Sequence, residues 1–220
     1  MPDPATSTPP LYFKQLELGP LQNFVYLVGD PQTRQAAIID PGWEVPTILR
    51  TLQEDGYQPA KVFVTHTHFD HVQGLEELLR THDVPVHVHG AEAAQLPVED
   101  GTLRPISGGE TVSVGRVPLA LIHTPGHTPG STCLLVHGRL LSGDTLFIRG
   151  CGRCDLPGGD PSALYHSLSQ TLHRLEDDTV LCPGHNYAPW PTMQLGEEKQ
   201  HNPFLASSSL EGFLRMTGFA

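Results

Sequence analysis

The sequence predicts an α+β fold in which two β-sheets pack face to face and helices cover their outer surfaces. Both halves of the chain are rich in short segments of β-forming residues, and segments of helical periodicity close each half. The 22 glycines and 21 prolines are spread along the chain, as expected for many tight turns between short elements. Because composition does not shift along the 220 residues, we expect a single domain.

The first half is predicted to begin with an antiparallel meander, because turn residues such as Gly19-Pro20 and Asp30-Pro31 separate its first three β-rich segments. A helix follows, with apolar residues at helical spacing and Gly56 as its stop. A short apolar run, a second helical segment and a further strand complete this half. The strands are predicted over 11–18, 23–30, 35–40, 61–65 and 85–89, and the helices over 45–55 and 71–80.

The second half repeats this arrangement with more strands. Segments 131–138 and 139–144 form a predicted hairpin, and Asp160 is placed to cap the helix that begins at Pro161. Two short helices are expected near the end of the chain. The strands are predicted over 111–115, 118–124, 131–138, 139–144 and 178–185, and the helices over 161–175, 194–200 and 208–216.

Charge and cysteine content narrow the class of protein and its compartment. A formal net charge of -11 argues against a nucleic-acid groove or an anionic membrane surface as partner. No apolar run approaches the roughly 18 residues of a membrane span. Residues 1–10 lack a basic start and an apolar stretch, so we expect a flexible tail there and one domain over residues 11–220. Four irregularly spaced cysteines make no disulfide framework, which favours a reducing cytoplasm.

Thirteen histidines are present, and the densest group of them follows the predicted strand 61–65. His66 and His68 are two residues apart in an extended segment, so their side chains point the same way. The chain then enters a helix, which directs Asp70 and His71 toward the same place from another angle. This density of ligand-type side chains at the carboxyl end of a strand predicts a metal site rather than a solvated, histidine-rich turn.

Three further segments end a predicted strand with a ligand-type side chain beside a glycine. Glycine lets the backbone turn sharply and approach a metal closely. A lone histidine after a strand is more often packed or exposed, but together these segments supply His127, Asp144 and His185. Imidazole and carboxylate ligands in this combination suit borderline ions such as Zn(II), Fe(II) and Mn(II). We therefore expect one or two divalent metal ions as cofactors.

The series H-x-H-x-D-H, followed by single His, Asp and His residues, resembles the metal-binding series of the metallo-β-lactamase fold superfamily. Segments GHTPGS, SGDTLF, CGR and PGHNY are similar to the glyoxalase II branch and its relative, the persulfide dioxygenases, and the resemblance runs from about Asn23 to Leu205. It implies an αββα sandwich of two mixed sheets, with the site at one edge of the sheets. It also implies that one metal is held by His66, His68 and His127, a second by Asp70, His71 and His185, and that Asp144 bridges them.

The resemblance implies a metallohydrolase that cleaves small thioesters, such as a hydroxyacylglutathione or a similar glutathione-derived substrate. A metal ion lowers the pKa of bound water to about 7, so metal-bound hydroxide is available as nucleophile near neutral pH. Asp70 can orient that water or pass its proton on, and Asp144 is the second carboxylate expected to be catalytic. The segment from Gln22 to Tyr26 also resembles the hydrolase branch.

Other functions stay open from the sequence. The main alternative is a mononuclear Fe(II) glutathione persulfide dioxygenase, which uses His66, His127 and Asp144 and leaves the other ligand positions empty. A lactonase and a catalytically silent metal-binding protein are further alternatives. The silent protein is disfavoured because every ligand position carries a ligand-type residue. No nucleic acid or membrane is expected as a partner, and a homo-oligomer is compatible with the sequence.

Two residues are assigned to the substrate by the resemblance. Arg153, in the CGR segment, and Tyr187 match residues that contact the glutathione part of the substrate in glyoxalase II enzymes. Without a role in substrate binding, Arg153 would be an exposed loop arginine and Tyr187 a packed tyrosine. Cys151 and Cys154 form a lone C-x-x-C and are expected to be small loop residues.

The end of the chain departs from the glyoxalase II pattern. Those enzymes carry an additional C-terminal helical domain whose basic residues help to hold glutathione. Here the residues that follow Pro203 include a single basic side chain, Arg215. The sequence therefore leaves specificity for glutathione open.

Overall fold

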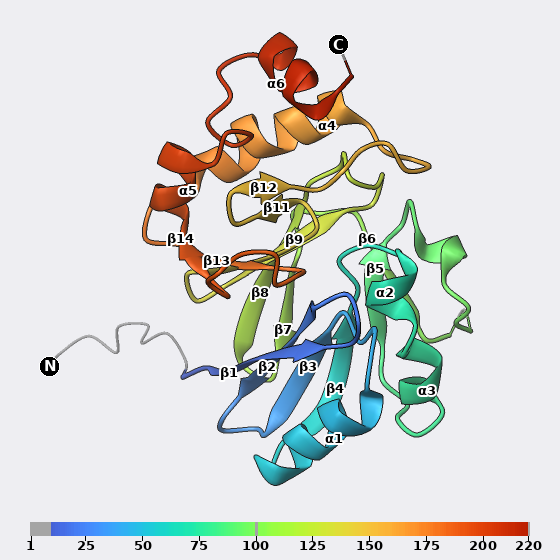
Figure 1. Cartoon of the computed structure of the whole chain (residues 1–220). Helices are drawn as coiled ribbons and strands as arrows, with labels where there is room; N and C mark the ends of the chain where they lie inside the picture. Colours follow the sequence, from blue (N-terminus) through green and yellow to red (C-terminus); the bar gives the residue numbers. More distant parts are fainter. Residues whose placement is uncertain (1–9, 100, 220) are drawn as a thin grey trace, which may run out of the picture.

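Two six-stranded sheets lie face to face in the computed structural model, which describes residues 10–99 and 101–219 (Figure 1). Of the predicted tail over residues 1–10, only Pro10 lies within the described residues. The first sheet has the order β1-β2-β3-β4-β5-β6, antiparallel from β1 to β3 and parallel from there on. Its strands are β1 (Tyr12–Leu18), β2 (Asn23–Asp30), β3 (Gln35–Ile39), β4 (Gln58–Phe63), β5 (Val86–His89) and β6 (Leu103–Ile106).

The second sheet has the order β14-β13-β10-β9-β8-β7. Only β10 and β13 pair in parallel, so both sheets are mixed, and β9 and β10 form the predicted hairpin. A separate two-stranded hairpin, β11 (Leu146–Phe147) and β12 (Gly150–Cys151), follows β10. The strands of the second sheet are β7 (Thr111–Val114), β8 (Val117–His123), β9 (Thr132–Val136), β10 (Arg139–Gly143), β13 (Val180–Pro183) and β14 (Met193–Gln194).

Helices lie on the outer face of each sheet, which gives the predicted order of layers: helix, sheet, sheet, helix (Figure 1). Within the described residues, no helix is long and apolar enough to cross a membrane. The helices are α1 (Val45–Glu54), α2 (Phe69–Val72), α3 (Leu75–Leu79), α4 (Pro161–His166), α5 (Leu195–His201) and α6 (Leu210–Thr217). Shorter turns are the 3-10 helices η1 (Ala93–Gln95) and η3 (Leu172–Arg174) and the π-helical turn η2 (Ser167–Thr171).

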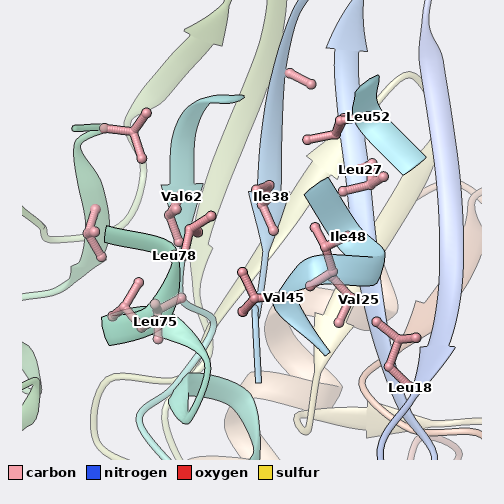
Figure 2. Packing of buried hydrophobic residues seen from close by; sticks show 14 of the residues in the cluster. Leu18, Val25, Leu27, Ile38, Val45, Ile48, Leu52, Val62, Leu75 and Leu78 are labelled. Carbon is pink, nitrogen blue, oxygen red and sulfur yellow. The ribbon is translucent and has the colours of Figure 1, made fainter. Parts of the chain in front are cut away.

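Aliphatic side chains join the first sheet to its helices (Figure 2). Val45, Ile48 and Leu52 recur at helical spacing on α1 and are buried against strand residues such as Val25 and Ile38. Each such side chain stabilises the fold by about 1.5–3 kcal/mol when it leaves water. The amphipathic pattern of α1 is therefore what places this helix on the sheet.

A second apolar cluster fills the space between the two sheets, and polar contacts cross it at its borders. The hydroxyl of buried Tyr26 donates to the carbonyl of Pro183 at 2.6 Å. Arg116, in the turn between β7 and β8, donates to both carboxylate oxygens of buried Asp30 at 2.7 and 2.9 Å. These contacts fix one sheet on the other, and with it the loops that follow the strands.

The strand predicted over 61–65 is β4, which begins and ends earlier in the chain. Thr65 lies beyond it, because its N–H and hydroxyl donate to the carboxylate of Asp40 at 2.7 and 2.6 Å instead of to a neighbouring strand. This carboxylate therefore turns the chain out of the sheet just before the first histidine of the cluster.

The helix predicted over 71–80 begins earlier, at Phe69, and is divided into α2 and α3. Gly74 stands between the two parts, packed against Pro41 so closely that a Cβ there would lie 2.5 Å from the Pro41 carbonyl oxygen. Only a glycine fits this approach, and the approach holds α2 against the end of β3.

Two further differences concern a helix of the second half and a strand of the first. The helix predicted over 161–175 is α-helical only as α4 and continues as η2 and η3, although Asp160 caps it as predicted and accepts the N–H of Ser162 and Ala163 at 2.8 and 2.9 Å. Strand β6 was not predicted. Its four residues include Arg104 and Pro105, which break the alternation of apolar and polar residues.

Candidate metal centre

The seven side chains predicted as metal ligands lie together where four strands end. The segment after β4 and the first turn of α2 carry four of them, and the loops after β8, β10 and β13 carry one each. Five are buried, and His68 and Asp144 are partly exposed. In chain order they are His66, His68, Asp70, His71, His127, Asp144 and His185.

Two of the glycines beside these side chains have the role that the sequence predicts. Gly126, which precedes His127, has a φ of 143°, a backbone conformation that other residues rarely adopt. A Cβ on Gly184 would lie 2.4 Å from Oδ1 of Asp144. A side chain at either position would therefore displace a neighbouring ligand-type residue or the loop that carries it.

The first predicted ligand group is brought together in the structure. Ligand atoms of His66, His68 and His127 all lie within 4.8 Å of one another. Nδ1 of His68 and Nε2 of His127 are 2.9 Å apart. His66 and His68 lie in the loop after β4 of the first sheet, and His127 lies in the loop after β8 of the second sheet. The group therefore spans the edge of the sandwich.

The second predicted group is equally compact. Nε2 of His71 and Nε2 of His185 are 3.2 Å apart. Oδ2 of Asp70 lies 3.5 Å from the His71 nitrogen and 3.3 Å from the His185 nitrogen. This group again joins the loop after β4 to a loop of the second sheet.

Asp144 lies between the two groups. Its Oδ1 is 3.3 Å from Nε2 of His71, and its Oδ2 is 3.4 Å from Nε2 of His185. The same Oδ2 is 3.7 Å from Nε2 of His127 and 4.0 Å from Nε2 of His66. This is the position that a carboxylate shared by two ions requires.

The cluster fits metal ions better than a network of hydrogen bonds. Two ligands of a tetrahedral ion with bonds of about 2.0–2.1 Å lie about 3.3 Å apart, close to the nitrogen–nitrogen distances here. Nε2 of His66 is buried and has no hydrogen-bond partner among the described residues. A buried ring nitrogen in that state costs free energy unless a ligand satisfies it. The cluster can therefore hold one or two divalent metal ions.

The charges of the cluster also favour cations. Burial opposes the charge of Asp144, but His71 and His185 hold the pKa of its carboxyl well below the usual range. Burial likewise opposes the charge of Asp70, yet His185 and His71 hold its pKa at about 2. In turn, and against the effect of burial, Asp144 and Asp70 raise the pKa of His185 to about 9. At neutral pH the carboxylates are ionised, and a bound cation would take the place of protons on the histidines.

A carboxylate that the sequence reasoning missed orients one ligand. Asp40, at the end of β3, lies 3.0 Å from Nδ1 of His71 and also accepts from Thr65. It is buried. Such a contact fixes the histidine tautomer, so that Nε2 carries the lone pair that faces Asp70 and Asp144. A strand that ends in a carboxylate followed by Pro41-Gly42 was the signal that could have found it.

Replacing Asp40 by asparagine is expected to weaken metal binding by about 10–100-fold, because the His71 ring loses its charged partner. A zinc titration of the metal-free protein, with binding followed by calorimetry, measures this change. Asp177→Asn removes an exposed carboxylate that pairs with Lys199 and is the matched control. An unchanged affinity in Asp40→Asn would show that this contact serves only the fold.

Other contacts position the remaining ligands. The amide of Asn23 donates to Oδ2 of Asp70 at 2.8 Å. Nδ1 of His127 lies 2.7 Å from the carbonyl oxygen of Arg153, and Nδ1 of His185 lies 2.8 Å from that of Leu21. His127 and His185 therefore each have a backbone partner on the side of the ring away from the cluster.

Glu92 joins the two loops that carry the first group. Its buried carboxylate accepts the N–H and hydroxyl of Thr67, between His66 and His68, at 2.8 and 2.9 Å. It also accepts the N–H of Gly130, in the loop after His127, at 2.7 Å. This contact holds ligands from different sheets at a fixed separation.

A cavity of about 590 Å³ opens above the cluster. Arg153 and Tyr187, the two residues assigned to the substrate, both line it. The Tyr187 ring stacks on His185 with centroids 4.7 Å apart. Nε and Nη2 of Arg153 donate to both carboxylate oxygens of Asp155 at 2.6 and 2.5 Å, a pairing that the sequence reasoning missed.

The two cysteines of the C-x-x-C are not linked to each other. Both thiols are free, and Cys151 also lines the cavity while Cys154 is buried. Burial raises the pKa of each thiol to about 12. Neutral thiols of this kind behave as small apolar side chains near neutral pH.

Comparison with known proteins decides the family. Residues 18–185 match the family described as the metallo-beta-lactamase superfamily. The chain belongs to this superfamily. It is 33% identical over 216 residues to the probable metallo-hydrolase YqgX of Bacillus subtilis (strain 168), covering 90% of this chain and 99% of that protein. The superfamily fold, with two mixed sheets between layers of helices, is thus confirmed as predicted.

Two further similarities concern the branches that the sequence resembles. The chain is 38% identical over 165 residues to a hydroxyacylglutathione hydrolase of Salmonella dublin, covering 75% of this chain but 62% of that enzyme. The crystal structure of ETHE1 from Myxococcus xanthus superposes with a TM-score of 0.85 and 34% identity, covering 94% of this chain and 90% of that one. The metallo-beta-lactamase superfamily member described here is therefore similar to both branches.

Proposed function

We propose that this protein is a binuclear metallohydrolase of small thioesters, with glutathione-derived thioesters among the candidate substrates. The observation that carries the proposal is the position of Asp144 between two complete ligand groups at the floor of an open cavity. In this proposal His66, His68 and His127 hold one ion, and Asp70, His71 and His185 hold the other. The imidazole and carboxylate donors suit Zn(II) or Fe(II), and Mn(II) is compatible with them.

The reaction adds water across the carbon–sulfur bond of the thioester and yields a carboxylic acid and a thiol, with no net oxidation. When bound, divalent ions supply acidified water and a polarised carbonyl near neutral pH. Asp70 stays ionised and can accept a hydrogen bond from the attacking water. Asn23 holds that carboxylate in place by donating to its Oδ2. Asp144 supplies negative charge midway between the two groups and keeps them at a fixed separation.

The second candidate is an Fe(II) persulfide dioxygenase, which the similarity to the ETHE1 structure favours. It would use His66, His127 and Asp144 and would consume dioxygen. The two functions share nearly all of their ligand residues; the hydrolase would fill the compact second group with a further ion, and the dioxygenase would leave it empty. A lactonase would use the same binuclear arrangement on an oxygen ester.

Two assays on the metal-loaded protein separate these functions. We expect cleavage of a thioester under anaerobic conditions, followed by release of free thiol, and no dioxygen uptake with glutathione persulfide. Uptake of dioxygen with the persulfide, without anaerobic thioester cleavage, would refute the hydrolase. Cleavage of a lactone with neither of the other activities would move the assignment to the lactonase.

A further inference from the structure

We propose that the cavity above the cluster selects thioesters with an apolar, uncharged acyl group. The inference rests on the thioester hydrolysis proposed above and narrows its substrate class. It is drawn from the side chains that line the cavity beyond the ligand-type residues, and from the state of the single arginine among them.

Apart from the predicted metal ligands, most of the side chains that line the cavity are apolar. They are Phe69, Phe147, Leu156 and Pro157, with the ring of Tyr187 beside them. Apolar and aromatic walls with a few convergent polar groups are typical of sites for apolar small molecules. The acyl group of a substrate whose carbonyl lies at the cluster would meet this wall.

Phe69 is fixed next to the chemistry and yet faces solvent. It is the residue between His68 and Asp70, and it is 61% exposed. Its ring meets Trp43 edge to face, with centroids 6.3 Å apart. When an apolar group covers such an exposed aromatic ring, apolar surface leaves water and the free energy of the complex falls.

A second aromatic wall is built around His185. Phe147 lies edge to face with Tyr187, with centroids 5.4 Å apart, and Tyr187 is 60% exposed. The Phe147 ring also meets His185 with centroids 6.0 Å apart. The cluster is thus bordered by exposed aromatic surface on the Phe69 side and on the Tyr187 side.

The cavity offers little to a negatively charged substrate. Arg153 is the only lysine or arginine among the described residues that line it. Its guanidinium is already held by both oxygens of Asp155. A substrate carboxylate would have to displace this partner, and the chain as a whole carries a net charge of -11. Glutathione, which has two carboxylates, is therefore a poorer match than an uncharged thiol.

The experiment uses the metal-loaded protein and acyl thioesters of N-acetylcysteamine, an uncharged thiol. The series runs from acetyl through butanoyl and hexanoyl to octanoyl. A succinyl thioester carries a charge on the acyl group, and lactoylglutathione carries its charges on the thiol. We expect kcat/KM to rise by about fourfold for each added methylene until the cavity is filled. The succinyl thioester should be cleaved at least tenfold less efficiently than the butanoyl thioester.

Variants assign the effect to the wall. Phe69→Ala and Leu156→Ala should lower kcat/KM for the hexanoyl thioester about tenfold, mainly through KM. Phe69→Leu should recover most of the loss. Trp190→Ala changes an exposed aromatic residue that does not line the cavity and is the matched control.

The possible results distinguish the apolar acyl site from the thioester hydrolysis on which it rests. A flat chain-length series in the unaltered protein, or a succinyl thioester cleaved as efficiently as the butanoyl thioester, refutes the apolar acyl site but leaves thioester hydrolysis standing. A tenfold preference for lactoylglutathione over the hexanoyl thioester contradicts the poorer match inferred for glutathione. Failure to cleave any thioester in the fully metal-loaded protein refutes both. Because the series is measured on the unaltered protein, the test holds even if a variant folds poorly.

Discussion

Asp144→Asn is expected to lower kcat for thioester cleavage by at least about 10³-fold, a loss of roughly 4 kcal/mol of transition-state stabilisation. The carboxylate lies within 3.3–3.4 Å of His71 and His185 and 3.7 Å of His127. An amide of the same shape carries no charge, and its nitrogen cannot act as a ligand. Both ligand groups would then lose the anion that they share.

The measurement is steady-state kinetics together with the metal content of each preparation. Asp177→Asn removes the same charge from an exposed position and should retain nearly full activity. An Asp144→Asn protein that keeps more than a tenth of the activity would contradict the role given to this carboxylate.

Removal of the metals with a chelator is expected to abolish activity and lower the melting temperature without unfolding the protein. The predicted ligands come from four separate chain segments, so bound ions join loops of both sheets. At a metal concentration of about 100 times Kd, binding stabilises the fold by about 2.7 kcal/mol. For a chain of this size that corresponds to a shift of roughly 5–10 °C.

The fold should survive because three buried apolar clusters lie outside the site. Circular dichroism of the chelated protein, followed by a thermal scan and then by readdition of Zn(II), measures both effects. Complete loss of secondary structure on chelation would show that the ions, rather than the apolar clusters, hold the sheets together. Activity that survives exhaustive chelation would contradict a metal centre of any kind.

The seven candidate ligands could be recognised in the sequence because each lies in a short loop after a strand or in the helical turn that follows one. Strands with an apolar pattern are easy to recognise, and glycine beside His127 and His185 marks where the chain approaches the site. The loop ends of neighbouring strands meet at one edge of the sheets. Local pattern and sheet geometry were therefore enough to select seven candidate residues from four segments, whereas their division into two groups followed from the resemblance to the superfamily.

The partners of these ligands could not be predicted in the same way. Asp40 contacts Thr65, 25 positions away, and Asn23 contacts Asp70, 47 positions away. Such contacts depend on how strands are ordered in the sheet, which no local pattern contains. Asp155 shows a different limit: it is close to Arg153 in sequence, but only the conformation of the loop turns the two side chains toward each other.

We propose that one chain holds two metal ions at the cluster. Elemental analysis of protein saturated with Zn(II) and freed of excess metal measures this number directly. We expect close to two equivalents for the unaltered chain and close to one for His185→Ala, which lacks a ligand of the second group only. A ceiling of one equivalent in the unaltered chain, unchanged by His185→Ala, would contradict the binuclear centre and with it the proposed hydrolase.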